Sequence, residues 1–406
     1  IATTTLELGI DVGAVESIAQ IGTPPSVASM RQRLGRAGRR GSPAILRVYI
    51  REPRIRSETP PHGRLRMPLV QTVAMVRLLA QRWYEPPVTG ALHLSTLVQQ
   101  VLSLLAQHGE ATAEQMFKLL CQAGPFRAVD APVFLPLLRD LGRAELVSQV
   151  HTGALVLGGA GERLVNQYDF YAAFTSPEEY RLEAGSRTLG TLPITYPVTV
   201  GLTLVFAGRR WKVTEVDDEQ KVISVVPAGG GRPPSFGGSA AAVHDRVRQE
   251  MRAVYLADDT PPFLDPEAQS LLAQGRTEFR RLELHERSMI PWEGGTLWFP
   301  WIGDRVLGTL QLQLTACGIP ANVEGAALLI GAFPPDELQV VLRRLASAGP
   351  ADGRILAESV ANKHVEKHHV WLSDALLEAD YASGRLDVAG ALAAVRMECG
   401  ASGAAA

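Results

Sequence analysis

The chain has 406 residues, of which 46% are hydrophobic and 20% are charged, with a formal net charge of −2 at pH 7. This length predicts about three domains, and the composition excludes a disordered chain. No stretch approaches the ~20 apolar residues of a membrane helix. Three widely spaced cysteines exclude a cysteine-rich zinc site and a disulfide scaffold, so we expect a cytoplasmic protein without membrane partners. We interpret the N-terminal Ile1, which has no methionine or signal peptide before it, as a cut end.

The first fifty residues predict alternating strands and helices. Residues 15–21 form an apolar strand candidate, residues 26–34 a helix that starts after Pro24-Pro25, and residues 44–50 a second strand. We interpret this segment as the tail of an α/β domain. An Arg- and Pro-rich stretch follows, with a helix over residues 69–84.

Residues 95–165 predict three helices and two short strands. Thr112 is placed to cap the second helix, and residues 131–141 form the third. Residues 146–150 and 154–157 predict a hairpin. This order is typical of a winged-helix domain, although a small helical packing domain without DNA contact has the same pattern.

Beyond residue 171 the hydrophobic period becomes two. Four strands (187–193, 199–206, 210–216 and 221–226) predict a small antiparallel barrel, followed by a flexible loop at 229–238. Trp211 on this barrel either stacks on a nucleic-acid base or packs inside. The remainder predicts further helices and strands, placed at residues 240–257, 265–282, 335–347 and 371–382 for the helices and 296–299 and 308–314 for the strands.

The positive charge of the chain is concentrated near its start. Between Arg31 and Arg66 there are eleven arginines against only Glu52 and Glu58. The densest part, residues 32–41, holds four arginines and three glycines. Glycines allow a ligand to approach the backbone closely, and one guanidinium group can bind two phosphate oxygens at once. This segment therefore predicts a phosphate-facing surface.

Two short motifs carry a resemblance to a known family. Residues 2–11 read Ala-Thr-Thr-Thr-Leu-Glu-Leu-Gly-Ile-Asp, and about twenty residues later Gln32 opens Gln-Arg-Leu-Gly-Arg-Ala-Gly-Arg. Their order and separation resemble motifs V and VI of superfamily 2 helicases, which belong to the second of two RecA-like motor domains. The alternative for the arginine cluster is a solvated basic loop that contacts nothing or contacts nucleic acid nonspecifically.

The resemblance implies roles for individual residues. Arg36 and Arg39 match the arginine fingers that meet the γ-phosphate of ATP when the motor closes. Gln32, Gly9 and Asp11 match positions that face the nucleotide, and Thr3 matches a position that contacts the nucleic-acid phosphate. The cofactors implied are ATP and Mg²⁺, held mostly by the first motor lobe.

The whole chain resembles the large helicase-related (Lhr) family. Besides both motifs, the winged helix, the barrel and the segments 185–190 and 386–391 carry this likeness. The family implies an ATP-dependent 3′→5′ translocase in DNA repair, acting on single-stranded DNA or RNA:DNA hybrids. It also implies a base-stacking tryptophan, for which the candidates are Trp211, Trp292, Trp298 and Trp301.

The predicted architecture is a multidomain chain of α/β and α+β parts. We assign residues 1–66 to the end of the second RecA-like lobe, 67–94 to a linker helix and 95–165 to the winged helix. Residues 166–400 form a C-terminal α+β domain containing the barrel, and residues 401–406 a disordered tail.

The phosphate-binding half of a motor is not recognisable in this sequence. None of the five lysines is followed by Ser or Thr, as a Walker A motif requires, and there is no Asp-Glu-Ala-Asp or Asp-Glu-x-His run. We therefore expect no ATP hydrolysis by this chain alone, and a first RecA-like lobe as its partner in cis or in trans. The alternative is a stand-alone nucleic-acid-binding module with a vestigial motor remnant.

One histidine cluster raises the question of a metal site. His364 and His368 are four residues apart, and His369 follows. Without a recognisable set of carboxylate partners, we interpret them as a solvated helix face and expect no metal.

Overall fold

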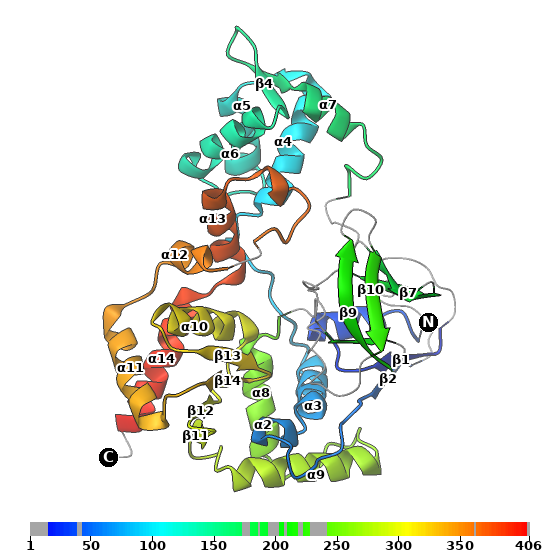
Figure 1. Ribbon diagram of the computed structural model, residues 1–406, viewed down its shortest axis with the longest axis vertical. Coiled ribbons are helices and arrows are strands. Elements are labelled where there is room, and N and C mark those ends of the chain that lie inside the picture. The colour runs from blue at the N-terminus through cyan, green and yellow to red at the C-terminus, as the bar shows by residue number, and fades with distance from the viewer. Residues whose placement is uncertain are drawn as a thin grey trace.

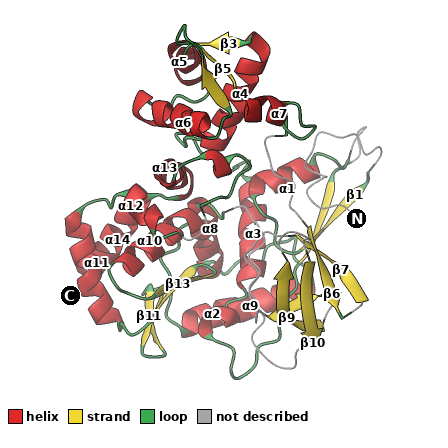
Figure 2. Ribbon diagram, turned by 45° about the horizontal axis from the view of Figure 1, so that its top comes forward, coloured by secondary structure: helices red, strands yellow, loops and turns green. Residues whose placement is uncertain are grey.

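The computed structural model describes residues 15–38, 43–172, 179–185, 187–193, 203–206, 209–217, 222–227, 242–360 and 363–403. A helical unit lies at one end of the long axis, and two sheet-bearing regions lie side by side at the other (Figure 1). The arrangement is a mixed helix and strand fold with several hydrophobic cores (Figure 2). No helix in the described ranges is long and apolar enough to span a bilayer.

The chain begins with a strand–helix–strand unit, as predicted. Its elements are β1 (Ser17–Ile21), α1 (Val27–Leu34) and β2 (Ile45–Tyr49). The two strands are parallel, with Ser17 opposite Ile45 and Ile21 opposite Tyr49. Because parallel neighbours need a crossover connection, the chain runs through α1 between the two strands, and Leu46 of β2 packs against the core to which α1 contributes Val27 and Met30.

A short helix, α2 (Pro61–Arg64), precedes α3 (Met67–Ala80), which overlaps the helix predicted at residues 69–84. The side chains of Val70, Val73 and Ala74 are fully buried. They share a core with α8 (Asp245–Leu256) and α9 (Pro266–Arg281). The segment predicted as a linker is therefore part of the C-terminal core.

The helical unit contains the three predicted helices and the predicted hairpin. Its elements are α4 (Leu94–His108), β3 (Glu110–Ala111), α5 (Ala113–Phe117), α6 (Ala131–Arg143), β4 (Val147–Gln149), β5 (Leu155–Leu157) and α7 (Gly159–Val165). The strands form a sheet in the order β3-β5-β4. Thr112 caps α5 as predicted, because its hydroxyl accepts from the Gln115 amide and the Gln115 side chain accepts from the Thr112 amide.

The middle of the chain forms a five-stranded sheet in the order β7-β6-β10-β9-β8. Its strands are β6 (Glu179–Ala184), β7 (Arg187–Pro193), β8 (Thr203–Phe206), β9 (Arg209–Asp217) and β10 (Val222–Pro227). Within the described strands, β7 and β8 are edges and do not pair, so no closed barrel is observed. The sheet is nevertheless curled so that its two edge strands come close. A Cβ atom added to Gly190 of β7 would lie only 2.6 Å from the ring of Phe206 on β8.

The C-terminal region is built on a four-stranded antiparallel sheet in the order β11-β12-β14-β13. Its strands are β11 (Met289–Trp292), β12 (Gly295–Trp298), β13 (Ala321–Glu324) and β14 (Ala327–Ile330). The helices of this region are α10 (Asp304–Ala316), α11 (Pro335–Ala348), α12 (Gly353–Glu358), α13 (Asp374–Arg385) and α14 (Val388–Gly403).

Two sequence predictions fail in this region. Residues 308–314 were predicted as a strand but lie inside α10, because the buried positions Val306, Leu307, Leu310 and Leu314 follow a helical period. The alternating Leu and Gln residues of this stretch imitate a strand pattern. Helix α14 also continues to Gly403, into the tail predicted to be disordered.

Candidate functional site

The candidate site is the helix α1 and the turn after it, which carry the second helicase-like motif. All free amides at the start of α1 are satisfied. The Ser26 hydroxyl accepts from the Ser29 amide, and the Glu85 carboxylate accepts from the amides of Val27 and Ala28 at 2.8 and 2.9 Å. An anion at a helix N-terminus also interacts favourably with the helix dipole. Glu85 therefore fixes the start of α1 from a remote part of the chain.

One face of α1 packs firmly on the body of the molecule. Val27 and Met30 are buried and share a core with Met75 and Leu78 of α3 and with Val247 of α8. Gln32 lies on the opposite face of α1 and is exposed, and Arg31, at the side of the buried face, is exposed as well. Gln32, the first residue of the motif, is thus presented to solvent from a helix that is packed on its other face.

The turn after α1 returns the chain to the sheet. The Gly38 amide donates to the carbonyl of Val15 at 3.1 Å, and Ala37 forms a parallel bridge with Val15. Gly38 has a φ of 67°, and a Cβ atom there would lie 2.3 Å from the backbone nitrogen of Ala44. Only glycine fits this position, so the last described glycine of the motif has a packing role as well as a conformational one.

Two arginines of the motif lie beside this turn. Arg33 donates to the side-chain oxygen of Gln20 on β1, which fixes it against the sheet. Arg36 is half-buried, and its backbone amide donates to the carbonyl of Arg33 at 2.9 Å. Arg36 therefore lies one residue beyond the C-cap of α1, at the same end of that helix as Gln32.

The predicted site residues fall into two groups. Gln32 lies in the last turn of α1, and Arg36 lies two residues after that helix ends. Thr3, Gly9, Asp11 and Arg39 lie outside the described residues.

The tryptophan candidates differ strongly in exposure. Trp211 is 8% exposed, packs in the core of the five-stranded sheet and donates through Nε1 to the carbonyl of Phe206. This favours the packing alternative for Trp211 over base stacking. Trp298 and Trp301 are also buried, whereas Trp292 is half-buried.

A cavity of about 660 Å³ lies between β2, α3 and the start of α9. Glu52 and Arg66 line it, with 3.6 Å between the Glu52 carboxylate and the Arg66 guanidinium. Burial raises the pKa of Glu52, although the Leu69 amide and Arg66 oppose that shift. Arg66 also donates to the carbonyl of Pro53 and to Gln274 of α9. This pair was not predicted from the sequence, and it joins the segment after β2 to the C-terminal core.

The histidine cluster differs from its prediction. Residues 363–368 are not helical, and His368 and His369 are each only 2% exposed. The interpretation as a solvated helix face is therefore wrong for these two residues, because α4 and α13 cover them. Burial, more than the nearby Lys367 charge, lowers the pKa of His368 to about 4.

Residues 1–41 match the family described as the helicase conserved C-terminal domain. The matched segment includes β1, α1 and the motif turn, so this end of the chain is similar to part of a helicase.

Similar relatives include two Lhr proteins. The chain is 26% identical over 317 residues to the Lhr helicase/uracil glycosylase of Escherichia coli, a match that covers 69% of this chain and 19% of that protein. Over 144 residues it is 50% identical to the ATP-dependent helicase Lhr-Core protein 2 of Thermococcus barophilus, covering 35% of this chain and 15% of that protein. The chain therefore spans less than a fifth of the length of these relatives.

A solved structure has a similar fold along almost the whole chain. The Mycobacterium smegmatis helicase Lhr bound to ssDNA and AMP-PNP has a TM-score of 0.57 and 18% sequence identity, covering 98% of this chain and 55% of that one. The resemblance predicted from the sequence is confirmed: the chain corresponds to the C-terminal part of an Lhr-family helicase.

Proposed function

We propose that this chain supplies the second-lobe half of an ATP-driven translocase and part of its single-strand channel. The observation that carries the proposal is the placement of Gln32 and Arg36 at the end of an α1 helix whose other face is packed on α3 and α8. Such rigid support suits residues that must meet a phosphate group in a fixed geometry.

In this proposal Arg36 and Arg39 are arginine fingers. Charge spreads over the oxygens of the transferred phosphoryl group, and a guanidinium group stabilises it there. Gly9, Asp11 and Gln32 face the nucleotide from the same lobe. ATP and Mg²⁺ are held mostly by a first RecA-like lobe, in cis or in trans, so this chain alone does not hydrolyse ATP.

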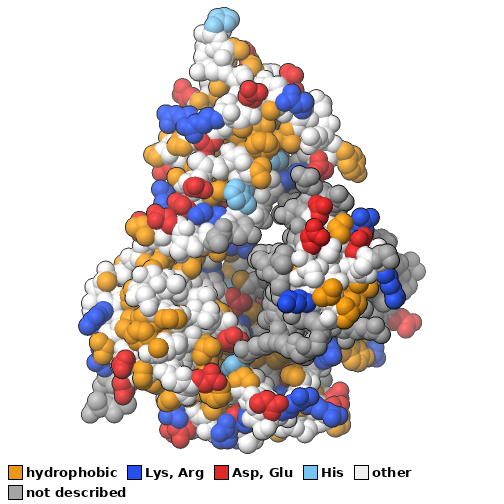
Figure 3. Space-filling view, viewed as in Figure 1, with side chains coloured by type: hydrophobic (Ala, Val, Ile, Leu, Met, Phe, Trp, Pro, Cys, Tyr) orange, Lys and Arg blue, Asp and Glu red, His pale blue; other side chains and the backbone are white. Residues whose placement is uncertain are grey.

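The proposed nucleic-acid partner is single-stranded DNA or an RNA:DNA hybrid, with translocation from 3′ to 5′. The solved relative was bound to ssDNA, and Thr3 matches a phosphate-contacting position. On the face that Figure 3 shows, basic side chains are distributed over the described surface, where they can contact phosphate groups. Of the four tryptophan candidates, Trp292 is the one whose ring is not buried, which supports it as the stacking residue.

We also propose the domain assignment made from the sequence, with two refinements. The order of helices and strands over residues 95–165 supports a winged helix. The contact between Gly190 and Phe206 supports an incompletely closed barrel in the five-stranded sheet. The predicted linker helix, α3, is assigned instead to the C-terminal core.

The proposal is tested by measuring ATP hydrolysis and binding of a fluorescent 30-nucleotide single strand by the purified chain. We expect no turnover, with or without DNA, together with DNA binding that weakens as salt rises. DNA-stimulated turnover would contradict the proposed need for another lobe. If the chain binds no DNA even at low salt, the proposed channel is contradicted. If it binds DNA in a salt-dependent way but adding a first RecA-like lobe restores no ATP hydrolysis, the stand-alone binding module is favoured.

A further inference from the structure

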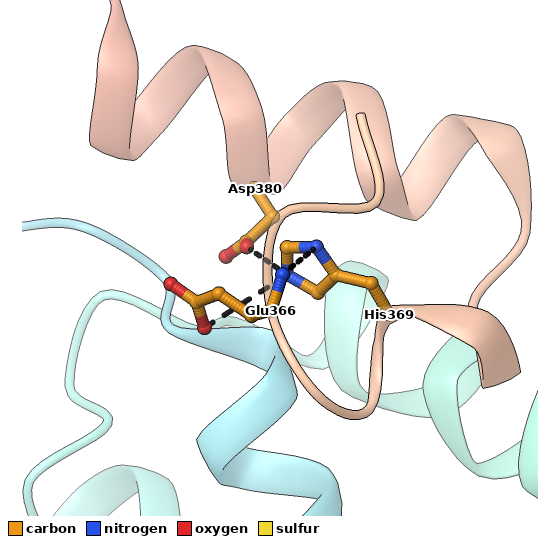
Figure 4. A group of neighbouring side chains, drawn as sticks. All are labelled: Glu366, His369 and Asp380. Atoms are coloured by element: carbon orange, nitrogen blue, oxygen red, sulfur yellow. Dashed lines mark hydrogen bonds and ion pairs between the residues drawn. The ribbon is translucent and has the colours of Figure 1, made fainter. Parts of the chain in front are cut away.

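The loop before α13 brings three potential metal ligands together. Glu366 and His369 lie on this loop, and Asp380 faces them from α13 (Figure 4). His369 is 2% exposed and Asp380 is 8% exposed. The carboxylate partners that the sequence pattern did not reveal are therefore supplied by the fold.

The geometry points to a metal site. Nε2 of His369 lies 3.0 Å from Oδ2 of Asp380 and 3.9 Å from Oε2 of Glu366, and all three ligand atoms lie within 4.8 Å of one another. Two ligands about 2 Å from a tetrahedral zinc ion are ~3.3 Å apart. We propose that Glu366, His369 and Asp380 bind a divalent transition-metal ion, for which zinc is the best-fitting candidate, with a fourth position open to water.

The atoms around the three ligands support this arrangement. Oδ1 of Asp380 accepts from the Leu94 amide at 3.0 Å, which turns Oδ2 toward the histidine. Nδ1 of His369 lies 3.1 Å from the carbonyl of Lys363. A proton on Nδ1 donated to that carbonyl leaves the Nε2 lone pair for a metal, which is the usual arrangement of a metal-bound histidine.

A competing arrangement uses the same atoms without a metal. The amides of Val365 and Glu366 lie 3.2 and 3.3 Å from Nδ1, so Nδ1 can act as an acceptor while Nε2–H donates to Asp380. In that case His369 and Asp380 form a metal-free hydrogen-bonded pair that holds the loop to α13, called the lock below. The two arrangements differ in what Glu366 does, because its side chain is essential only to the metal site.

The position of the site indicates its consequence. Asp380 holds the first amide of α4, and the His368 amide donates to the Ser95 hydroxyl at 3.0 Å. A bound ion would therefore fasten the loop before α13 to the start of the helical unit. The role is structural, and metal binding would add to the stability of this joint.

The test is zinc titration of the complete chain after tag removal and chelation, followed by calorimetry and thermal unfolding. We expect one zinc ion per chain and an unfolding temperature that rises with zinc concentration. Cobalt(II) in place of zinc should give a visible spectrum with nitrogen and oxygen ligands and no thiolate charge-transfer band. A thiolate band would assign the bound ion to a cysteine and overturn the proposal.

Glu366→Gln is the decisive variant. Its side chain is partly exposed, so the metal-free variant should unfold at the wild-type temperature while its zinc affinity falls at least about tenfold. His364→Gln is the matched control, because this exposed histidine on the same loop lies outside the ligand set and should keep wild-type affinity. Absence of saturable zinc binding to the wild type, or wild-type affinity in Glu366→Gln, would overturn the site and leave the lock.

Discussion

The Glu85 carboxylate is bound to the first two amides of α1, at 2.8 Å from Val27 and 2.9 Å from Ala28. These residues are more than fifty positions apart in the chain. The contact links the segment after α3 to the helix that carries Gln32 and is followed by Arg36. The position of the motif therefore depends on a residue outside it.

Removing this carboxylate should loosen α1. We expect Glu85→Ala to lower the free energy of unfolding by about 1–2 kcal/mol, because two helix amides lose their acceptor and the helix dipole loses its anion. Urea denaturation measures the change. Glu58→Ala is the control, since Glu58 is exposed and pairs loosely with Arg56, and its effect should be near zero. Equal stability of the two variants would show that Glu85 does not hold the helix.

Gly38 should tolerate no side chain. Gly38→Ala places a Cβ atom 2.3 Å from the backbone of Ala44, whereas a Cβ atom on Gly22 meets nothing within 4 Å. Both glycines have positive φ, so both alanine variants carry backbone strain. Only Gly38→Ala adds a steric clash, and the difference between the two costs measures that clash. We expect Gly22→Ala to cost about 1 kcal/mol and Gly38→Ala clearly more, as measured by urea denaturation. Equal costs would contradict the close packing of the motif turn on β2.

The buried thiol of Cys121 should make stability fall at alkaline pH. Burial raises its pKa from 9.0 to about 11. The unfolded chain loses this proton first, so stability is fully present below pH 9 and is lost as pH rises toward 11, by at most about 3 kcal/mol. Urea unfolding at pH 8 and pH 10.5 measures the difference. Cys121→Ala should reduce this decline, and the exposed Cys317→Ala should not.

The half-buried Trp292 should matter for DNA binding. Stacking on a base contributes about 1–3 kcal/mol, so Trp292→Ala should weaken single-strand binding by about 5- to 150-fold. Fluorescence anisotropy with a labelled strand measures the affinity. The control is Trp298→Phe, because Trp298 is fully buried and donates to Glu398 inside the C-terminal core. A folded Trp292→Ala variant with wild-type affinity would remove this residue from the channel.

Local signals explain which elements were predictable. Ser26 after two prolines marks the start of α1, and Thr112 with Gln115 marks α5, because caps and capping boxes depend only on neighbouring residues. The motif likewise predicts Gln32 and Arg36 as site residues without any knowledge of the fold.

Long-range contacts explain what was missed. Burial of His369 depends on Asp380 and the start of α4, and the support of α1 depends on Glu85. Contacts between residues so far apart in the sequence leave no local sequence pattern from which they could be predicted. The prediction of a strand over residues 308–314 was wrong for a related reason. The alternation of Leu and Gln is a local pattern, whereas the helix is stabilised by packing of Leu310 and Leu314 into the C-terminal core.

The central claim is that Arg36 acts on the phosphate of ATP held by another lobe. Its most direct test is the rate of DNA-stimulated ATP hydrolysis when this chain is joined to a motor lobe that binds the triphosphate. Arg36→Ala should lower turnover by about 10³-fold or more while single-strand binding stays near wild type. Arg31→Ala should keep normal turnover, because Arg31 is an exposed arginine of α1 that lies outside the motif. Normal turnover in Arg36→Ala would contradict the account.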